Sequence, residues 1–289
     1  MGVKITPEEF PLMRDAIEQI CGIRVGDGKA YLIESRLSKL LAEYGCDSFR
    51  GFHQLVKARL DADLRSKLIN AMSTQETLWF RDMHPFRIFS EKLLPAYLAE
   101  FAAGQRQRVR IWSAASSTGQ EAYSLAMLIL EAHRTQSAVS PAAFEILGTD
   151  IASSAVDAAK NALFDRIAMG RGLPAEYRGR YFTDDGRYCR IVDDVKRMAT
   201  FCCFNLQENF AALGHFDIVF CRNVAIYFSD AFKRELYKKV NAVLNPGGYL
   251  FLGSSESISA YSTDFELLDH KGGLYYRAKA APEAARMAA

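Results

Sequence analysis

The sequence lacks the short motifs that would assign a metal site, a disulfide framework or a membrane span. Its six cysteines show no C-x-x-C spacing, and its five histidines are scattered without an H-E-x-x-H pattern. We therefore expect reduced thiols and no bound metal. The longest apolar run, from about Leu125 to Leu130, is far shorter than a membrane span, and no signal peptide is recognisable. These absences predict a soluble, cytoplasmic protein.

An excess of charge of one sign is also lacking. The 36 Lys and Arg residues nearly balance the 34 Asp and Glu residues, which gives a formal net charge of +2. Without a concentrated basic stripe, we expect no nucleic-acid partner. The dinucleotide fingerprint G-x-G-x-x-G is absent, which argues against a nicotinamide cofactor. The remaining composition, 49% hydrophobic over 289 residues, is typical of a globular chain with one large or two modest domains.

Residues 1–72 are predicted to form a small all-helical domain. Thr6-Pro-Glu-Glu9 combines a capping residue, a proline and an acid three residues after the cap, and apolar residues then recur at helical spacing. Further helices are expected from about Lys29 to Tyr44, after Ser48, and from about Asp63 to Met72. The helix from about Lys29 to Tyr44 has basic residues that form either a solvated face or a docking surface for an acidic partner. These residues are Lys29, Arg36 and Lys39.

Residues 73–107 are predicted to connect this domain to the rest of the chain. A long helix is expected from about His84 to Ala103. Before it lies Ser73-Thr-Gln-Glu-Thr-Leu-Trp-Phe-Arg81, which shows no clear period. The sequence Trp79-Phe-Arg81 is unusual for a solvated tether, which makes this segment a candidate for function.

The stretch from Val109 to Ser124 predicts the start of an open α/β sheet. A short apolar run turns through small residues at Ser113–Gly119 into a helical pattern that begins at Gln120. Gly119 can adopt dihedral angles closed to other residues, and small residues let the backbone approach a ligand. Ligands bind beyond the carboxyl ends of strands in such sheets. An ordinary strand-to-helix turn without a ligand is the alternative.

The remaining α/β domain is predicted over residues 108–280. Its second strand, Phe144–Asp150, ends in an acid, a position where these folds hold ribose hydroxyls, although the acid could also cap the next helix. Residues 164–197 are rich in Arg and Gly around Asp184-Asp-Gly186 and predict a small antiparallel insertion. Other expected elements are a helix at 153–163, strands at 199–205, 216–223 and 249–253, a helix at 230–244 closed by Asn245-Pro-Gly-Gly248, a hairpin of 265–269 with 274–277, and a disordered tail at 281–289.

Four motifs in this order resemble the CheR family, the chemotaxis receptor glutamate methyltransferases that use S-adenosylmethionine (AdoMet). They are Trp112-Ser-Ala-Ala-Ser-Ser-Thr-Gly-Gln-Glu-Ala-Tyr-Ser124, Gly148-Thr-Asp-Ile151, Phe220-Cys-Arg-Asn-Val-Ala-Ile-Tyr-Phe228 and Asn245-Pro-Gly-Gly248. The resemblance covers nearly the whole chain. It implies a Rossmann-like class I methyltransferase sheet with a small antiparallel β insertion and an N-terminal all-helical domain.

The resemblance also implies roles for individual residues. Asp150 would hold the ribose hydroxyls, Glu121 would lie near the amino-acid part of the cofactor, and Asn205 with Leu206 would frame the adenine. Arg81 and Tyr227 would line the methyl-transfer site, although Arg81 could instead pair with Asp82 or Glu76, and Tyr227 could be a core aromatic. The full expected cofactor set is Gln75, Thr77, Arg81, Ala114, Gly119, Glu121, Asp150, Asn205, Leu206, Arg222 and Asn223, and the expected receptor-docking residues are Arg36 and Lys39.

The implied reaction methylates receptor glutamates and releases S-adenosylhomocysteine (AdoHcy), for sensory adaptation. The expected partner is the cytoplasmic helical domain of chemoreceptors, and we expect a monomer without membrane insertion. The short Asp184-Asp-Gly186 turn predicts independence from a C-terminal tethering pentapeptide on the receptor. The alternatives are a catalytically idle AdoMet- or receptor-binding module and a methyltransferase for nucleic acid or small molecules. The latter is disfavoured because Arg222-Asn-Val-Ala225 stands where base-amine methyltransferases carry Asn/Asp-Pro-Pro-Tyr/Phe.

Overall fold

Capping interactions start the helices of the N-terminal domain. The Thr6 hydroxyl accepts from the Glu9 amide at 3.3 Å and the Glu9 carboxylate accepts from the Thr6 amide at 2.9 Å, which is the reciprocal arrangement of a capping box. Ser48 and Asp61 cap two later helices through the amides of Gly51 and Leu64. Apolar residues at helical spacing pack together between α1 (Glu9–Cys21), α2 (Ala30–Glu43), α3 (Phe49–Ala58) and α4 (Ala62–Met72).

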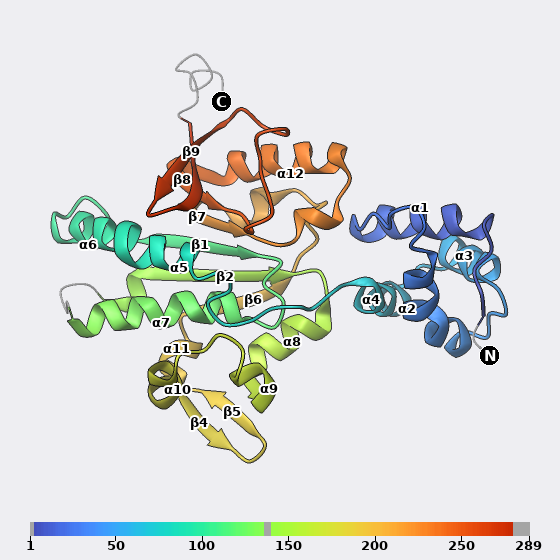
Figure 1. The fold of residues 1–289 in the computed structure, drawn as a ribbon, viewed down its shortest axis with the longest axis horizontal. Helices are drawn as coiled ribbons and strands as arrows, with labels where there is room; N and C mark the ends of the chain where they lie inside the picture. Colours follow the sequence, from blue (N-terminus) through green and yellow to red (C-terminus); the bar gives the residue numbers. More distant parts are fainter. Residues whose placement is uncertain (1–2, 136–139, 280–289) are drawn as a thin grey trace.

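The computed structural model describes residues 3–135 and 140–279, and a mixed sheet lies at its centre (Figure 1). In these residues seven strands take the order β6-β2-β1-β7-β8-β10-β9. The first five in this order are parallel to one another, and the β9–β10 hairpin pairs antiparallel at one edge. The strands are β1 (Val109–Ala114), β2 (Phe144–Asp150), β6 (Ala199–Cys203), β7 (Phe216–Cys221), β8 (Leu244–Phe251), β9 (Phe265–His270) and β10 (Gly273–Ala278).

Alternate residues of the central strands pack on opposite faces of the sheet. Ile111 and Ile218 lie in the core beneath α7 (Gln120–Thr135) and α8 (Ser153–Asn161). Trp112 and Val219 point to the other face, which α12 (Asp230–Val243) and a short 3-10 turn η3 (Phe210–Leu213) cover. Both faces are therefore buried, as expected for a largely parallel sheet, and the ligand-binding region is left at the strand ends. A second 3-10 turn, η2 (Pro141–Ala143), precedes β2.

The helix predicted from His84 to Ala103 contains a change of winding. It runs as α5 (His84–Ile88), a π-helical turn η1 (Phe89–Leu93) and α6 (Leu94–Ala102). These elements pack in the same core as α7. Apolar periodicity predicted the helix, but a single π turn has no strong sequence signature.

The insertion contains more helices and strands than the small antiparallel hairpin that the sequence predicted. It holds a three-stranded antiparallel sheet of order β3-β5-β4, formed by β3 (Leu163–Asp165), β4 (Phe182–Asp185) and β5 (Tyr188–Ile191). Short helices α9 (Arg166–Met169), α10 (Ala175–Tyr181) and α11 (Asp193–Lys196) accompany it, and we call the whole of 163–197 the β-subdomain. It lies below the main sheet in Figure 1. The expectation that Leu163 ends a helix was wrong, because Ala162 takes a left-handed conformation (φ 56°) that ends α8.

Two further expectations concern the C-terminal part of the chain, namely the segment Asn245–Gly248 and the tail. Asn245-Pro-Gly-Gly248 does not close a helix before a strand but lies inside β8, where the pairing with β7 shifts register between Phe216 and Ile218. The Asn245 amide donates to Asp217 Oδ1 at 2.9 Å, which fixes this irregular segment against β7. The tail at 281–289 lies outside the described residues. Among those that are described, no helix combines the length and apolar character needed to cross a bilayer.

Candidate active site

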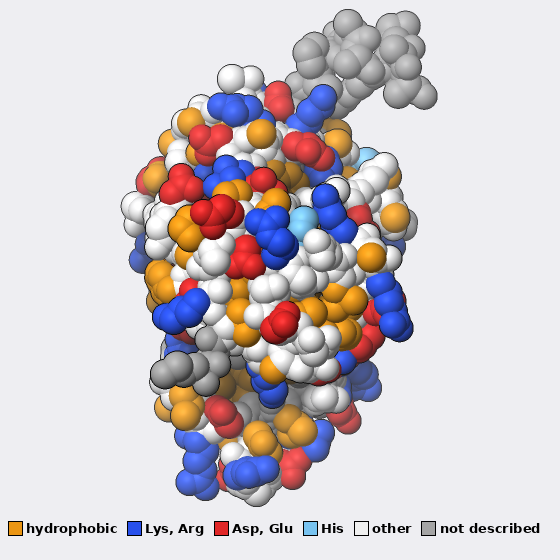
Figure 2. Space-filling model, turned by 90° about the vertical axis from the view of Figure 1, so that its right-hand side faces the viewer, with side chains coloured by type: hydrophobic (Ala, Val, Ile, Leu, Met, Phe, Trp, Pro, Cys, Tyr) orange, Lys and Arg blue, Asp and Glu red, His pale blue; other side chains and the backbone are white. Residues whose placement is uncertain are grey.

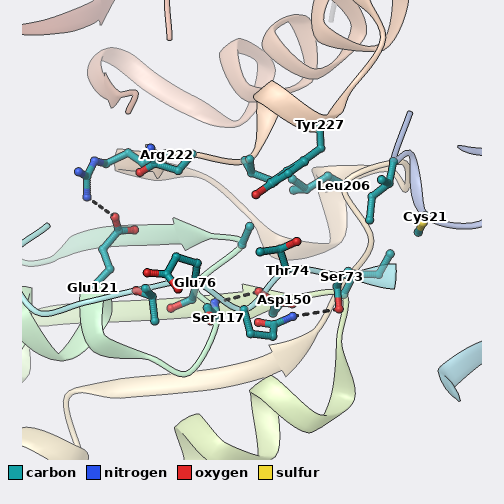
Figure 3. Close-up of a pocket in the computed structure, with 18 of the residues that line it drawn as sticks. Cys21, Ser73, Thr74, Glu76, Ser117, Glu121, Asp150, Leu206, Arg222 and Tyr227 are labelled. Carbon is teal, nitrogen blue, oxygen red and sulfur yellow. Dashed lines mark hydrogen bonds and ion pairs between the residues drawn. The ribbon is translucent and has the colours of Figure 1, made fainter. Parts of the chain in front are cut away.

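A cavity lies at the carboxyl ends of β1, β2 and β7, where the strand order reverses (Figure 3). This position is the one at which open α/β sheets bind their ligands. It contains about 920 Å³ of space, part of which opens to solvent. Its walls come from both domains and from residues 73–83, which we call the connecting segment: Cys21, Ile23, Ser73, Thr74, Gln75, Glu76, Thr77, Leu78, Arg81, Ala115, Ser116, Ser117, Glu121, Asp150, Ile151, Phe204, Asn205, Leu206, Arg222, Asn223, Val224, Tyr227 and Phe228.

Asp150 at the end of β2 presents a buried carboxylate to the cavity. Its Oδ2 accepts from the Ser117 amide at 2.8 Å and its Oδ1 accepts from the Ala152 amide at 2.9 Å. Burial raises the pKa of Asp150, and the hydrogen bonds from the backbone amides only partly offset that effect. The carboxylate lines the cavity, where it can accept from a ligand hydroxyl. The contact with Ala152, just before α8, shows that a role in ordering the helix start and a role toward a ligand are compatible.

Several buried polar atoms around Asp150 have no hydrogen-bond partner among the described residues. They are Gln75 Oε1, Ser116 Oγ and Ser117 Oγ. Unpaired buried polar atoms are costly and therefore uncommon in folded proteins. All three residues line the cavity. Their grouping beside a carboxylate indicates a place where a polar ligand supplies the missing partners.

Glu121, in the first turn of α7, supplies a second carboxylate. Its Oε1 accepts from the Ser113 hydroxyl at 2.7 Å and its Oε2 accepts from Arg222 Nη1 at 2.8 Å (Figure 3). The Arg222 guanidinium is buried, and its Nη2 also donates to Asp82 Oδ2 at 2.8 Å and to the Arg81 carbonyl at 2.7 Å. Arg222 therefore links Glu121 to the connecting segment, in addition to lining the cavity.

The connecting segment crosses the cavity in an unusual backbone conformation. Phe80, Asp82 and Met83 all have positive φ, at 48°, 66° and 54°. Such conformations are unfavourable for residues with side chains and persist only where neighbouring contacts hold them. Arg81 lies within this turn, and its Nη1 donates to the Glu76 carbonyl at 3.0 Å. The alternative that Arg81 pairs with Asp82 does not hold, because the Asp82 carboxylate pairs with Arg222.

The helical domain closes one side of the cavity. The Asn205 side-chain amide donates to the Ile20 carbonyl at 3.1 Å, and the Gln207 side chain donates to the Glu18 carbonyl at 3.1 Å. Cys21 lines the cavity directly, and burial raises the pKa of its thiol to about 11, so it stays a protonated, unreactive group. The end of α1 is thus part of the site.

Tyr227 stands between this cavity and a neighbouring groove. It enters the cavity from the side opposite Asp150 (Figure 3), and its carbonyl accepts from the Arg24 amide at 2.8 Å. The groove beyond it has mixed basic and apolar walls formed by Ile23, Arg24, Val25, Gly26, Lys29, Leu32, Arg36, Met72, Thr74, Ile226 and Tyr227. Tyr227 also packs partly against the core, so both interpretations of this residue describe its position.

Most of the predicted site residues line the cavity, and four do not. Ala114 lies in the core, and Gly119 packs against Ala159, Phe201 and Tyr123. Arg36 lines the groove, where it donates to the Met72 carbonyl and to Thr74 Oγ1, whereas Lys39 is exposed on α2. The predicted residues that line the cavity are Gln75, Thr77, Arg81, Glu121, Asp150, Asn205, Leu206, Arg222, Asn223 and Tyr227. Their contact with a cofactor stays a prediction.

Sequence reasoning missed several residues of the cavity. Cys21 and Ile23 were overlooked because the contact between α1 and the α/β domain has no local sequence signal. Ser116 and Ser117 follow β1 in a turn where Ala115 and Ser117 have positive φ, at 57° and 51°. The run of small residues there was a usable signal for close approach of the backbone, but it did not distinguish individual side chains.

The fold and site define a class of protein, an AdoMet-dependent methyltransferase. Residues 75–273 match the family model described as CheR methyltransferase, SAM binding domain, and residues 8–73 match the model described as CheR methyltransferase, all-alpha domain. The chain therefore belongs to the CheR methyltransferase family, and the predicted family, fold class and cofactor are confirmed. The SAM binding match begins at residue 75, within the region 73–107 that was predicted to connect the two domains, so the predicted domain boundaries stay predictions.

Curated relatives resemble the chain over nearly its full length. Chemotaxis protein methyltransferase of Vibrio anguillarum is 43% identical over 280 residues, which cover 96% of this chain and 99% of the relative. Chemotaxis protein methyltransferase 1 of Vibrio cholerae serotype O1 gives the same identity and coverage. Chemotaxis protein methyltransferase 1 of Pseudomonas aeruginosa is 41% identical over 273 residues, covering 94% of this chain and 98% of the relative.

The chemistry of the cavity fits AdoMet. Two carboxylates, Asp150 and Glu121, suit the ribose hydroxyls and the ammonium group of the cofactor. The unpaired oxygens of Gln75, Ser116 and Ser117 suit its remaining polar groups. Apolar walls from Leu206 and other lining residues suit the adenine ring.

Proposed function

We propose that the protein transfers the methyl group of AdoMet to glutamate side chains of methyl-accepting chemotaxis receptors, for sensory adaptation. The products are glutamyl methyl esters and AdoHcy. The reaction takes place in the cytoplasm, on the helical domain that the receptors expose there. The observation that carries the proposal is the position of Arg81 and Tyr227, which line the AdoMet cavity together while Tyr227 also lines the adjoining basic groove.

The chain's own residues have to align the reactants rather than to move a proton. A glutamate side chain with a pKa of about 4.3 is already ionised at neutral pH, so no general base is required. Bound AdoMet supplies an electrophilic methyl group on a sulfonium sulfur. We assign to Arg81 the task of orienting the attacking carboxylate, and to Tyr227 the task of shielding it from water. Alignment of this kind is worth up to about 7–11 kcal/mol in favourable systems.

The groove beside Tyr227 is the docking surface that we propose for the receptor helix. Arg24, Lys29 and Arg36 line the groove, which suits a helix that presents several glutamates. Ile226 is 49% exposed at the edge of the groove and offers an apolar contact. Lys39 lies one turn further along α2 and extends the basic surface. On the side of the molecule shown in Figure 2, Lys and Arg side chains are interspersed with Asp and Glu side chains.

Tether independence is also part of the proposal. The hairpin between β4 and β5 is closed by only Gly186 and Arg187, because Asp185 pairs directly with Tyr188. A turn of two residues offers little surface with which to grip a peptide. We therefore expect receptors without a C-terminal pentapeptide to serve as substrates, with the protein acting as a monomer.

Transfer of radiolabelled methyl from AdoMet to membranes that carry candidate receptors tests the function. We expect label on the receptor that alkali releases, since carboxylate methyl esters are base-labile. The matched control is the same receptor with its helix glutamates changed to alanine, which should stay unlabelled. Receptors with and without a C-terminal pentapeptide should be labelled equally. Binding of AdoHcy without any transfer to receptor would contradict the proposal and favour an idle binding module.

A further inference from the structure

The β-subdomain holds the connecting segment that crosses the cofactor cavity. Trp79 of that segment is fully buried, and its ring meets Phe164 of β3 at 4.8 Å and Phe182 of β4 at 5.3 Å, both edge-on. Its amide donates to the Arg171 carbonyl at 3.1 Å. The next residue, Phe80, contacts Tyr177 of α10 at 5.2 Å between ring centroids. The segment is therefore anchored in the β-subdomain by side chains and by its backbone.

A polar chain of contacts runs from the same part of the β-subdomain to Arg81. The Arg171 guanidinium forms an ion pair with Glu76, which holds the pKa of that carboxyl below its usual value. The Glu76 carbonyl in turn accepts from Arg81 Nη1 at 3.0 Å. Both side chains of the ion pair are partly exposed, so the pair orients Glu76 but contributes little stability.

Gly172 allows the backbone of the β-subdomain to approach the connecting segment closely at Trp79. Its φ is +86°, and a Cβ added there would lie 2.2 Å from the Trp79 carbonyl oxygen and 3.1 Å from Leu78 Cδ1. A backbone carbonyl cannot move away as a flexible side chain can. Any side chain at position 172 must therefore displace the connecting segment, and Leu78 and Thr77 of that segment line the cofactor cavity.

We propose that the Arg171–Gly172 turn is a positioning element for the methyl-transfer site. By fixing the backbone at Trp79 it sets the place of Thr77, Leu78 and Arg81 over the cofactor. Arg171 and Gly172 themselves do not line the cavity; they act through the connecting segment. The inference rests on the proposed function for the role of Arg81 toward the acceptor, whereas its consequence for cofactor binding is independent of any receptor.

Gly172→Ala is the principal test, with Gly186→Ala as its matched control. Gly186 lies in the same β-subdomain with φ +64°, yet a Cβ there would meet nothing within 4 Å. Both variants suffer the strain of a positive φ, but only the first pushes on Trp79. Calorimetric titration with AdoHcy should show affinity weakened by at least about tenfold in Gly172→Ala and unchanged within about twofold in Gly186→Ala. Equal affinities in the two variants would overturn the proposal.

A second pair of variants keeps the test decisive if Gly172→Ala does not fold. Arg171→Ala removes the ion pair with Glu76, whereas Arg190→Ala removes the exposed Arg190–Asp185 ion pair, both members of which lie in the β4–β5 hairpin. We expect a fall of about two- to fivefold in kcat for Arg171→Ala, partial rescue by Arg171→Lys and no change for Arg190→Ala. Identical kcat values for Arg171→Ala and wild type would refute the positioning role. Absence of receptor methylation by wild type would refute only the proposed function, since the AdoHcy titrations remain interpretable.

Discussion

Asp150 supplies a buried carboxylate to the cofactor cavity. Its position at the end of β2 was predictable, because the residue type and the strand boundary are both local features. Its raised pKa was not, because burial depends on contacts with residues distant in sequence. Burial holds the pKa of Asp150 above the usual value of an aspartate.

Affinity for AdoHcy should fall in acid because of Asp150. We expect ribose hydroxyls to donate to the ionised carboxylate, so binding should favour the deprotonated form and weaken as pH falls through the pKa of Asp150, which burial raises. Asp150→Asn should bind more weakly at about pH 7.5 and show a much flatter profile down to about pH 4.5. Calorimetric titration across this range measures both. Parallel profiles for variant and wild type would mean that another group governs the pH dependence.

Arg81→Ala should lower kcat by at least about tenfold, because alignment of the acceptor carboxylate is lost. Single-turnover methylation of receptor membranes measures the effect on the chemical step. Arg87→Ala is the control, since Arg87 donates to the Lys271 carbonyl away from the cavity. Near-wild-type turnover in Arg81→Ala would remove Arg81 from the mechanism.

At the scale of elements, the turn from β1 to α7 shows what a residue pattern can and cannot predict. The strand, the turn and the helix were predictable from the apolar run, the small residues and the helical spacing that follow one another. The contact of Gly119 with the cofactor stays a prediction, and the structure shows Ala159, Phe201 and Tyr123 close to this glycine at φ +91°. The same glycine pattern suits close packing of helix on strand and close approach of a ligand, and sequence alone does not separate the two.

Gly119→Ala should therefore destabilise the fold. The left-handed conformation costs an alanine about 1–2 kcal/mol, and contacts of 3.0–3.1 Å to three neighbours add to that cost. Gly104→Ala, with φ +70° and open space around it, should lose only the conformational part. Urea unfolding of the two variants measures the difference. A smaller loss for Gly119→Ala than for Gly104→Ala would contradict this account of the turn.

The elements that were predicted least well belong to the β-subdomain and to β8. The three short helices of the β-subdomain have four to seven residues each. That is too few to show a helical period of apolar residues among the many Arg and Gly residues. In β8 the Asn-Pro-Gly-Gly run has the composition of a turn, but pairing with β7 and the Asn245–Asp217 hydrogen bond keep it in the sheet. Tertiary contacts therefore overrode local preference in β8, whereas the helices of the β-subdomain are too short to be recognised.

At the scale of the whole molecule, residues of both predicted domains line a single cavity. Asn205 and Gln207 donate to carbonyls at the end of α1, and Ser66 and Asn70 of α4 contact Ser153 of α8. The division into helical and α/β regions was readable from periodicity. The contact between them was not, because it depends on backbone carbonyls and small hydroxyls that carry no pattern.

Heating should therefore unfold both domains in one transition that AdoHcy moves as a whole. At a ligand concentration one hundred times Kd, binding to the folded state adds about 2.7 kcal/mol to the free energy of unfolding. Differential scanning calorimetry with and without AdoHcy measures the shift. Two transitions, of which only the later α/β one moves, would show that the helical domain takes no part in binding.

The residues that line the cavity come from distant parts of the sequence, and this has a consequence for synthesis in the cell. The walls of the cavity begin at Cys21 and end at Phe228. Ribosomes release the N-terminus first, so α1–α4 can fold while β7 is still being made. We expect a nascent chain to bind AdoMet only after that late strand has emerged and paired. Chains truncated before β7 should then not compete for the cellular methyl donor.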